Sequence, residues 1–141
     1  MLKRDGSLVF FTILSQWSVG IIVCLTGLSL AGSHFLETSA CPANRVVLAL
    51  VLVVVATTVS LLHLGNPVNA PKAARNLATS WLSREILAIG LFSACLVATL
   101  LAARVPGSAA YSNVLLPACS LAGLILVWSM ARVYRIPTVP A

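Results

Sequence analysis

The amino-acid sequence predicts an all-α protein, a polytopic membrane helix bundle with four transmembrane helices. Apolar residues make up 60% of the chain and charged residues 9%, whereas about 25% of residues are charged in soluble domains. The mean hydropathy is +1.03. The apolar residues form four runs, each near the roughly 20 residues that a helix needs to cross a bilayer; they are 8–30, 46–64, 86–103 and 114–131. We expect a single transmembrane domain over residues 1–141.

The first run, 8–30, is predicted to be a retained helix. It is longer than the apolar core of a signal peptide, about 7 to 15 residues, and three further runs follow it. Its glycines, Gly20 and Gly27, are expected to allow close helix packing. Its polar residues are expected to hydrogen-bond to neighbouring helices; they are Ser15, Gln16, Ser18 and Thr26. The alternative for Gln16 is a contact with a cofactor.

The loop after this run, 31–45, contains His34, Glu37 and Cys41. Their spacing matches no zinc pattern, and a structural zinc site would need a fourth donor. We therefore expect a polar turn that binds no metal. The other cysteines lie in apolar runs without a C-x-x-C pair and are interpreted as small buried hydrophobes.

The connection between the second and third runs holds much of the polar chemistry. His63 lies in the last turn of the second run, and Gly65 and Pro67 are expected to end that helix. The pattern over 72–83 predicts a short helix lying in the headgroup plane. Arg84 and Glu85 precede the third run, which is short, so we expect Arg84 or Glu85 to lie near the interface. Glu85 is expected in the first helical turn, where the helix dipole favours a carboxylate.

The fourth run is predicted to be interrupted early by Pro117, after a short turn that contains Tyr111. Trp128 and Tyr134 close it beside Arg132, as is typical of the aromatic belt at a membrane–water interface.

Lysine and arginine are distributed unequally between the two sides of the predicted bundle. Seven of the nine lie on the side of the two chain ends and the second loop, and two on the other side, Arg45 and Arg104. The positive-inside rule then predicts that both termini are cytoplasmic. The net charge of +6 is explained by this topology and by contact with membrane lipid, and it gives no reason to expect nucleic acid binding.

Haem between the helices is not expected. Paired axial histidines would be needed, yet His34 and His63 are predicted at opposite ends of a span, most of a bilayer thickness of about 30 Å apart. If the protein handles electrons, it should do so without its own metal centre. The chain also lacks a phosphate loop, a nucleophile elbow and paired carboxylates, which argues against intrinsic hydrolase chemistry.

Several motifs resemble the dimethyl sulfoxide reductase membrane-anchor (DmsC-like) family. They are H-L-G-N-P at 63–67 and S-W-L-S-R-E-I at 80–86, with weaker likeness at 8–12, 131–135 and 138–141. The resemblance implies a haem-free anchor in the bacterial plasma (inner) membrane, which oxidises menaquinol and passes electrons to an iron–sulfur subunit that feeds a molybdopterin catalytic subunit. It also implies that His63 belongs to the quinol site. Family members have eight spans, so the chain resembles an N-terminal half.

The residues suit this chemistry independently. A quinol site needs a group that takes a proton near neutral pH, for which histidine is suited. His63 is therefore our candidate catalytic residue, with a helix-capping or interhelical hydrogen bond as the alternative. Trp81 is expected to line the slot for the ring, Arg84 to favour a deprotonated quinol oxygen and Glu85 to relay protons. The alternative for these two charged residues is an interfacial ion pair or extension toward the headgroups.

Two other function classes stay open at this point. One is a structural membrane anchor or assembly protein without quinol chemistry. The other is a small four-helix transporter, although the ionisable groups that couple transport normally lie inside the spans. Here the four apolar runs contain none apart from His63, near the end of a run.

Overall fold

The computed structural model describes residues 2–31, 42–63, 81–105 and 109–133. Within these ranges there are four helices and no strand. The helices are α1 (Leu2–Leu30), α3 (Pro42–His63), α5 (Trp81–Ala102) and α6 (Ala109–Val133). Each contains a stretch long and apolar enough to cross a membrane, so the predicted all-α membrane bundle is confirmed.

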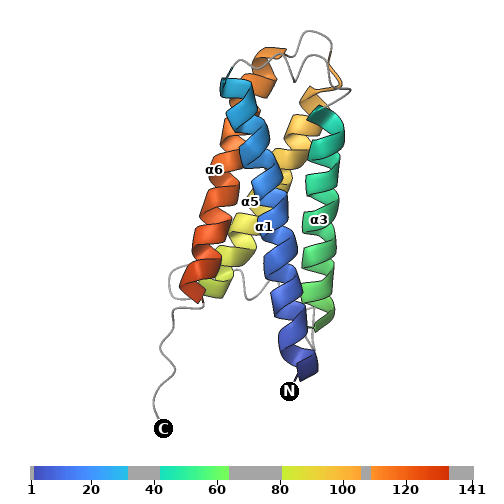
Figure 1. Cartoon of the computed structure of the whole chain (residues 1–141), viewed down its shortest axis with the longest axis vertical. Coiled ribbons are helices and arrows are strands. Elements are labelled where there is room, and N and C mark those ends of the chain that lie inside the picture. Colours follow the sequence, from blue (N-terminus) through green and yellow to red (C-terminus); the bar gives the residue numbers. More distant parts are fainter. Residues whose placement is uncertain (1, 32–41, 64–80, 106–108, 134–141) are drawn as a thin grey trace.

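The four helices alternate in direction along the bundle (Figure 1). Each packs mainly against two others: α1 and α5 both lie between α3 and α6. The start of α1, the end of α3, the start of α5 and the end of α6 therefore share one end of the bundle, which we call the N-terminal end. The topology predicted from the sequence places the two chain ends and the second loop on one side of the bundle in the same way.

Small and apolar residues line the bundle axis, where Ile22, Ala49 and Phe92 are fully buried. Large apolar residues such as Trp17, Leu30 and Val114 lie on the outside. Such an outer surface is matched to lipid tails, which are as apolar as leucine. Association of the helices must then depend on packing and on interhelical hydrogen bonds.

Two hydroxyls of α1 form hydrogen bonds to other helices. Ser18 Oγ donates to the carbonyl oxygen of Ala49 in α3 at 2.7 Å. Thr26 Oγ1 lies 2.6 Å from Ser120 Oγ of α6 and donates to the carbonyl oxygen of Leu116 at 3.1 Å. The predicted interhelical role is confirmed for Ser18 and Thr26. Gln16 is exposed on the outer surface.

Close packing occurs at a different glycine from those predicted. A Cβ added to Gly20 or Gly27 would meet nothing within 4 Å, so the expectation that these two allow close helix approach is wrong. A Cβ on Gly123 of α6 would lie 2.9 Å from Val19 Cγ1 of α1 and 3.2 Å from Phe92 Cε2 of α5. Gly123 is therefore the position where three helices meet.

Helix α5 begins earlier than the apolar run suggested. Its candidate span is Trp81–Ala102, which includes Arg84 and Glu85, and its first turn contains no acidic residue. The prediction of Glu85 in the first turn is therefore wrong, while its position near the interface stays a prediction. Trp81 and Ser83 belong to α5, and the rest of the predicted interfacial helix, 72–80, lies outside the described residues.

Helix α6 also differs from the prediction, because it continues through Pro117 and already includes the backbone of Tyr111. Proline is tolerated in membrane helices where the surroundings satisfy the backbone groups that it frees.

Candidate functional site

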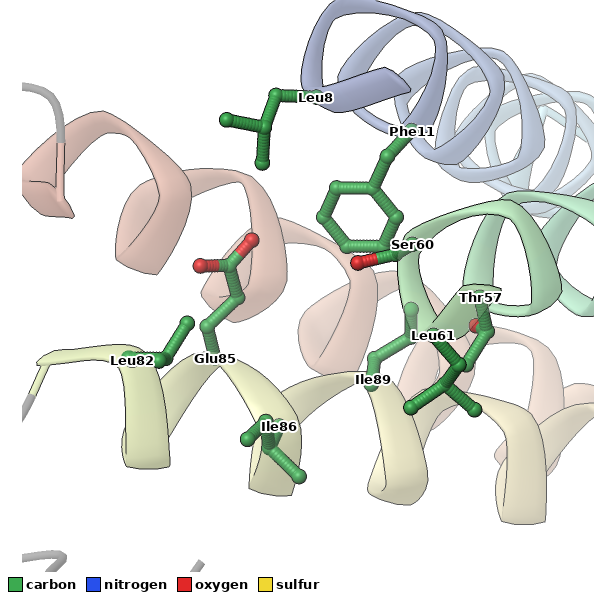
Figure 2. Close-up of a pocket in the computed structure, with 9 residues that line it drawn as sticks. All are labelled: Leu8, Phe11, Thr57, Ser60, Leu61, Leu82, Glu85, Ile86 and Ile89. Carbon is green, nitrogen blue, oxygen red and sulfur yellow. The ribbon is translucent and has the colours of Figure 1, made fainter. Parts of the chain in front are cut away.

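A pocket of about 180 Å³ lies at the N-terminal end of the bundle, between α1, α3 and α5 (Figure 2). Its walls are mostly apolar, with one carboxyl and two hydroxyl groups. The lining residues are Leu8, Phe11, Thr57, Ser60, Leu61, Leu82, Glu85, Ile86 and Ile89. An apolar pocket with a few convergent polar groups is the usual form of a small-molecule site.

Glu85 is the acidic group of this pocket. Its side chain is only 8% exposed, and no residue in the described ranges forms an ion pair or hydrogen bond with its carboxyl. Taking a carboxyl group out of water without a partner is costly. An ionisable residue within a membrane span marks a functional site in most membrane proteins, and Glu85 meets that description.

The polar atoms of the pocket face one another. Figure 2 shows the Glu85 carboxyl rising from α5 and the Ser60 hydroxyl projecting from α3 into the same space, next to the Phe11 ring. Thr57 Oγ1 donates to the carbonyl oxygen of Val53 in its own helix at 2.8 Å, which leaves its lone pairs available. The pocket thus offers both a hydrogen-bond donor and acceptors to a ligand with hydroxyl or carbonyl oxygens.

Two further hydroxyls lie close by on α1. Ser7 Oγ and Ser15 Oγ are buried and lack a hydrogen-bond partner within the described part of the chain. They precede and follow Phe11 by four residues, which places all three on one helical face. This face of α1 therefore carries unmet hydrogen-bonding capacity beside the pocket.

His63 is the last residue of α3, at the N-terminal end of the bundle. It follows Leu61 by two residues and Ser60 by one helical turn, and both of these line the pocket. The structure describes the backbone of His63 and not its side chain. Its role as proton acceptor stays a prediction.

Trp81 and Arg84 lie in the first turn of α5 and do not line the pocket, and Trp81 faces α6. The rings of Trp81 and Trp128 are 5.6 Å apart in an edge-to-face arrangement. The Arg84 guanidinium carbon lies 4.4 Å from the centre of the Trp81 ring, and that of Arg132 lies 5.4 Å from it. Cation–π contacts of this kind stabilise both partners. Of the four predicted site residues, the structure thus places Glu85 in the pocket and Trp81 and Arg84 beside it.

No group of three potential metal ligands occurs among the residues that the structure describes. His34, Glu37 and Cys41, which the sequence analysis considered for a metal site, lie outside the described ranges. Cys24, Cys95 and Cys119 are unpaired thiols. Cys119 is fully buried, whereas Cys24 is exposed on the outer surface, so the interpretation as a buried hydrophobe is wrong for Cys24.

The sequence analysis missed Phe11 and Ser60 as pocket residues. Ser60 had a usable signal, because it and Thr57 are polar residues one turn apart in the last turns of an apolar span that ends in His63. Phe11 had none, since an aromatic residue in a membrane span is unremarkable by itself.

Comparison with known proteins agrees with this reading of the chain. The family described as DMSO reductase anchor subunit (DmsC) matches residues 3–141. The chain is 32% identical to the anaerobic dimethyl sulfoxide reductase chain YnfH of Escherichia coli (strain K12) over 146 residues, which cover 97% of this chain and 48% of that relative. The chain therefore spans about half the length of the curated relative that it matches. No solved structure matches it.

Proposed function

The chain belongs to the DMSO reductase anchor subunit (DmsC) family, and from this premise we propose that it binds and oxidises menaquinol in the membrane. The electrons would pass to an iron–sulfur subunit, which feeds a molybdopterin catalytic subunit in anaerobic respiration. The observation that carries the proposal is the buried Glu85 carboxyl, which has no partner among the described residues and lies in an apolar pocket within a candidate membrane span.

The reaction has defined needs. Oxidation of a quinol to a quinone breaks two O–H bonds and releases two electrons and two protons. The electrons leave to the iron–sulfur subunit, and the protons need acceptors close to the hydroxyl oxygens. Imidazole changes its charge between about pH 5 and 8, so His63 is proposed to take a proton as general base. Glu85 is proposed to relay protons to the N-terminal end of the bundle.

The pocket supplies the other requirements of a quinol site. Phe11 and Ile89 are apolar surfaces for the ring, and the Ser60 hydroxyl is a hydrogen-bond partner for a quinol oxygen. Trp81 and Arg84 are not part of the pocket wall. We still propose that they contact the part of the ligand that extends beyond the pocket, because both lie within four residues of Glu85. Arg84 would favour a deprotonated quinol oxygen there.

The decisive test is the variant His63→Leu in the complete assembly. Leucine keeps the bulk of the side chain but cannot accept a proton. Loss of one hydrogen bond to the quinol weakens binding by about 0.5 to 1.5 kcal/mol, whereas loss of general-base assistance lowers the rate about a hundredfold or more. Quinol-dependent turnover should therefore fall much further than quinol affinity.

The control is an artificial electron donor that reduces the catalytic subunit directly. The rate of turnover with this artificial donor should be unchanged in His63→Leu, because the substitution does not alter the catalytic subunit. If quinol-dependent turnover also survives, His63 has a structural role. If the unaltered assembly neither binds a quinol analogue nor oxidises quinol, the chain is a structural anchor or a transporter.

We also propose that the protein carries no haem and no metal of its own. Elemental analysis and the visible spectrum of the purified protein test this. A stoichiometric metal or a Soret band would contradict it.

The orientation is a further proposal. The four helix ends at the N-terminal end of the bundle carry Lys3, Arg4, Arg84 and Arg132, and the opposite end carries Arg45 and Arg104. Together with the basic residues of the chain ends, this supports a bacterial inner-membrane protein with both termini cytoplasmic. Reporter fusions at either terminus should be active on the cytoplasmic side, and activity only outside the cytoplasm would contradict the assignment.

Finally, we propose that a second set of four spans completes an eight-helix anchor. The length of the relative supports this, since the match covers 48% of it. The neighbouring genomic sequence tests the proposal: it should contain a reading frame for four more apolar spans.

A further inference from the structure

The size of the pocket restricts which part of a ligand it can hold. Pockets that enclose a whole drug-sized ligand measure about 300 to 1,000 Å³, and this one measures about 180 Å³. That volume suits a head group of one or two fused rings. A lipid-soluble quinol also carries a long apolar tail, which must lie elsewhere.

The exposure of the pocket walls shows where a tail can leave. Phe11 of α1, 7% exposed, closes one side of the pocket. Leu8 and Leu82 of the wall are 47% and 51% exposed; they lie at the starts of α1 and α5, at the N-terminal end of the bundle and away from the bilayer centre. On the side away from Phe11, Leu61 of α3 is 39% exposed and Ile86 of α5 is partly exposed. These two residues come from neighbouring helices that pack against each other, so the pocket borders the outer surface between α3 and α5.

The surface beyond this edge leads toward the bilayer centre. Gly90 follows Ile86 by four residues, so it lies on the same side of α5 and about 6 Å further along the helix. It is exposed, and a Cβ there would meet nothing within 4 Å. Val54 and Leu61 present exposed apolar side chains on the neighbouring helix α3. No side chain therefore covers the outer surface at Gly90, and the exposed side chains beside it are apolar.

We propose that the quinol tail leaves the pocket between Leu61 and Ile86 and lies along α5 over Gly90, so that the ligand enters sideways from the bilayer. This rests on the proposed quinol function and adds a substrate class, quinols with a compact head group and an extended isoprenoid tail. The apolar tail stays in the hydrocarbon region throughout, while the oxygens reach Glu85 and Ser60 through the α3–α5 edge.

The test compares two substrates in the complete assembly: a long-tailed menaquinol in the membrane and a naphthoquinol of the same ring system without a tail. Gly90→Phe places a ring on the proposed tail path, and the Cβ of the new side chain meets no neighbouring atom within 4 Å. Excluding about two methylene groups of the tail from this surface should raise KM for the long-tailed quinol about tenfold. KM for the tail-less quinol should be unchanged.

Leu87→Trp is the matched control. Leu87 is exposed on the same helix and does not line the pocket, so an added ring there should change KM for neither substrate. Ile86→Trp narrows the exit itself and should act like Gly90→Phe. The artificial-donor rate reports whether each variant assembles.

The outcomes are distinguishable. A selective effect on the long-tailed quinol at Gly90 and Ile86 supports the lateral path. Equal effects on both quinols, or none on either, overturn it, because the tail then leaves by another route. If the unaltered assembly oxidises the tail-less quinol, the proposed function stands whatever the variants show; if it oxidises neither quinol, the proposed function itself fails.

Discussion

Buried polar groups on the α6 side of the bundle and in the pocket differ in their hydrogen-bond partners. On the α6 side, the Thr26 hydroxyl contacts Ser120 Oγ at 2.6 Å and the Leu116 carbonyl oxygen at 3.1 Å. Gly123 of α6 allows both α1 and α5 to approach α6 closely. In the pocket, the Glu85 carboxyl is equally buried but unpartnered within the described ranges. Satisfied polar groups hold helices together, whereas an unsatisfied one is available to a ligand.

The largest effect is expected at Glu85. Glu85→Gln keeps the shape of the side chain and removes its ability to take up a proton, so quinol-dependent turnover should fall about a hundredfold or more. Because the carboxyl has no ion-pair partner in the part of the chain that the structure describes, the thermal unfolding temperature of the assembly should not fall. Parallel measurement of both quantities checks this. Marked destabilisation with unchanged turnover would show that Glu85 is a structural residue, like the hydroxyls of the α6 side.

The next effect is expected at Gly123. A methyl group there would lie within 3.2 Å of both Val19 and Phe92 side chains, and overpacking of this kind costs about 1–3 kcal/mol. Gly123→Ala should therefore unfold at a lower fraction of sodium dodecyl sulfate in mixed micelles. Gly20→Ala is the matched control, because its Cβ meets nothing; alanine there should be neutral or stabilising by about 0.5–1 kcal/mol. Equal stability of the two variants would mean that the three helices do not meet at Gly123.

The smallest effect is expected at Thr26. Thr26→Val keeps the shape of the side chain and removes the hydrogen bonds to α6. Interhelical hydrogen bonds in membranes contribute about 0.6 kcal/mol on average and at most about 1.7 kcal/mol, so the unfolding free energy should fall by about that much. Thr58→Val is the control, since its exposed hydroxyl donates only to Val54 of its own helix. If Thr26→Val lowers the unfolding free energy no more than Thr58→Val does, the hydrogen bonds to α6 do not stabilise the bundle. The difference drawn between the α6 side and the pocket would then be wrong.

The sequence alone determined the class of protein, the four spans and the grouping of their ends. These follow from the length and apolarity of local runs, because bilayer thickness sets how many residues must be buried in lipid. It also pointed to the His63–Glu85 region, since polar residues are scarce in so apolar a chain. The interhelical roles of Ser18 and Thr26 were predictable for the same reason: a hydroxyl in a span needs a partner.

Only the tertiary structure decided which residues face the bundle axis. In a membrane both faces of a helix are apolar, so hydrophobic periodicity does not mark the inner face, and Gly20 and Gly27 could not be distinguished from Gly123 by sequence. Nor could a count of apolar residues place Glu85 inside a span, because its burial depends on α1 and α3 packing over it. The pocket that brings Phe11, Ser60 and Glu85 together joins three helices that are distant in sequence, and only their packing against one another defines it.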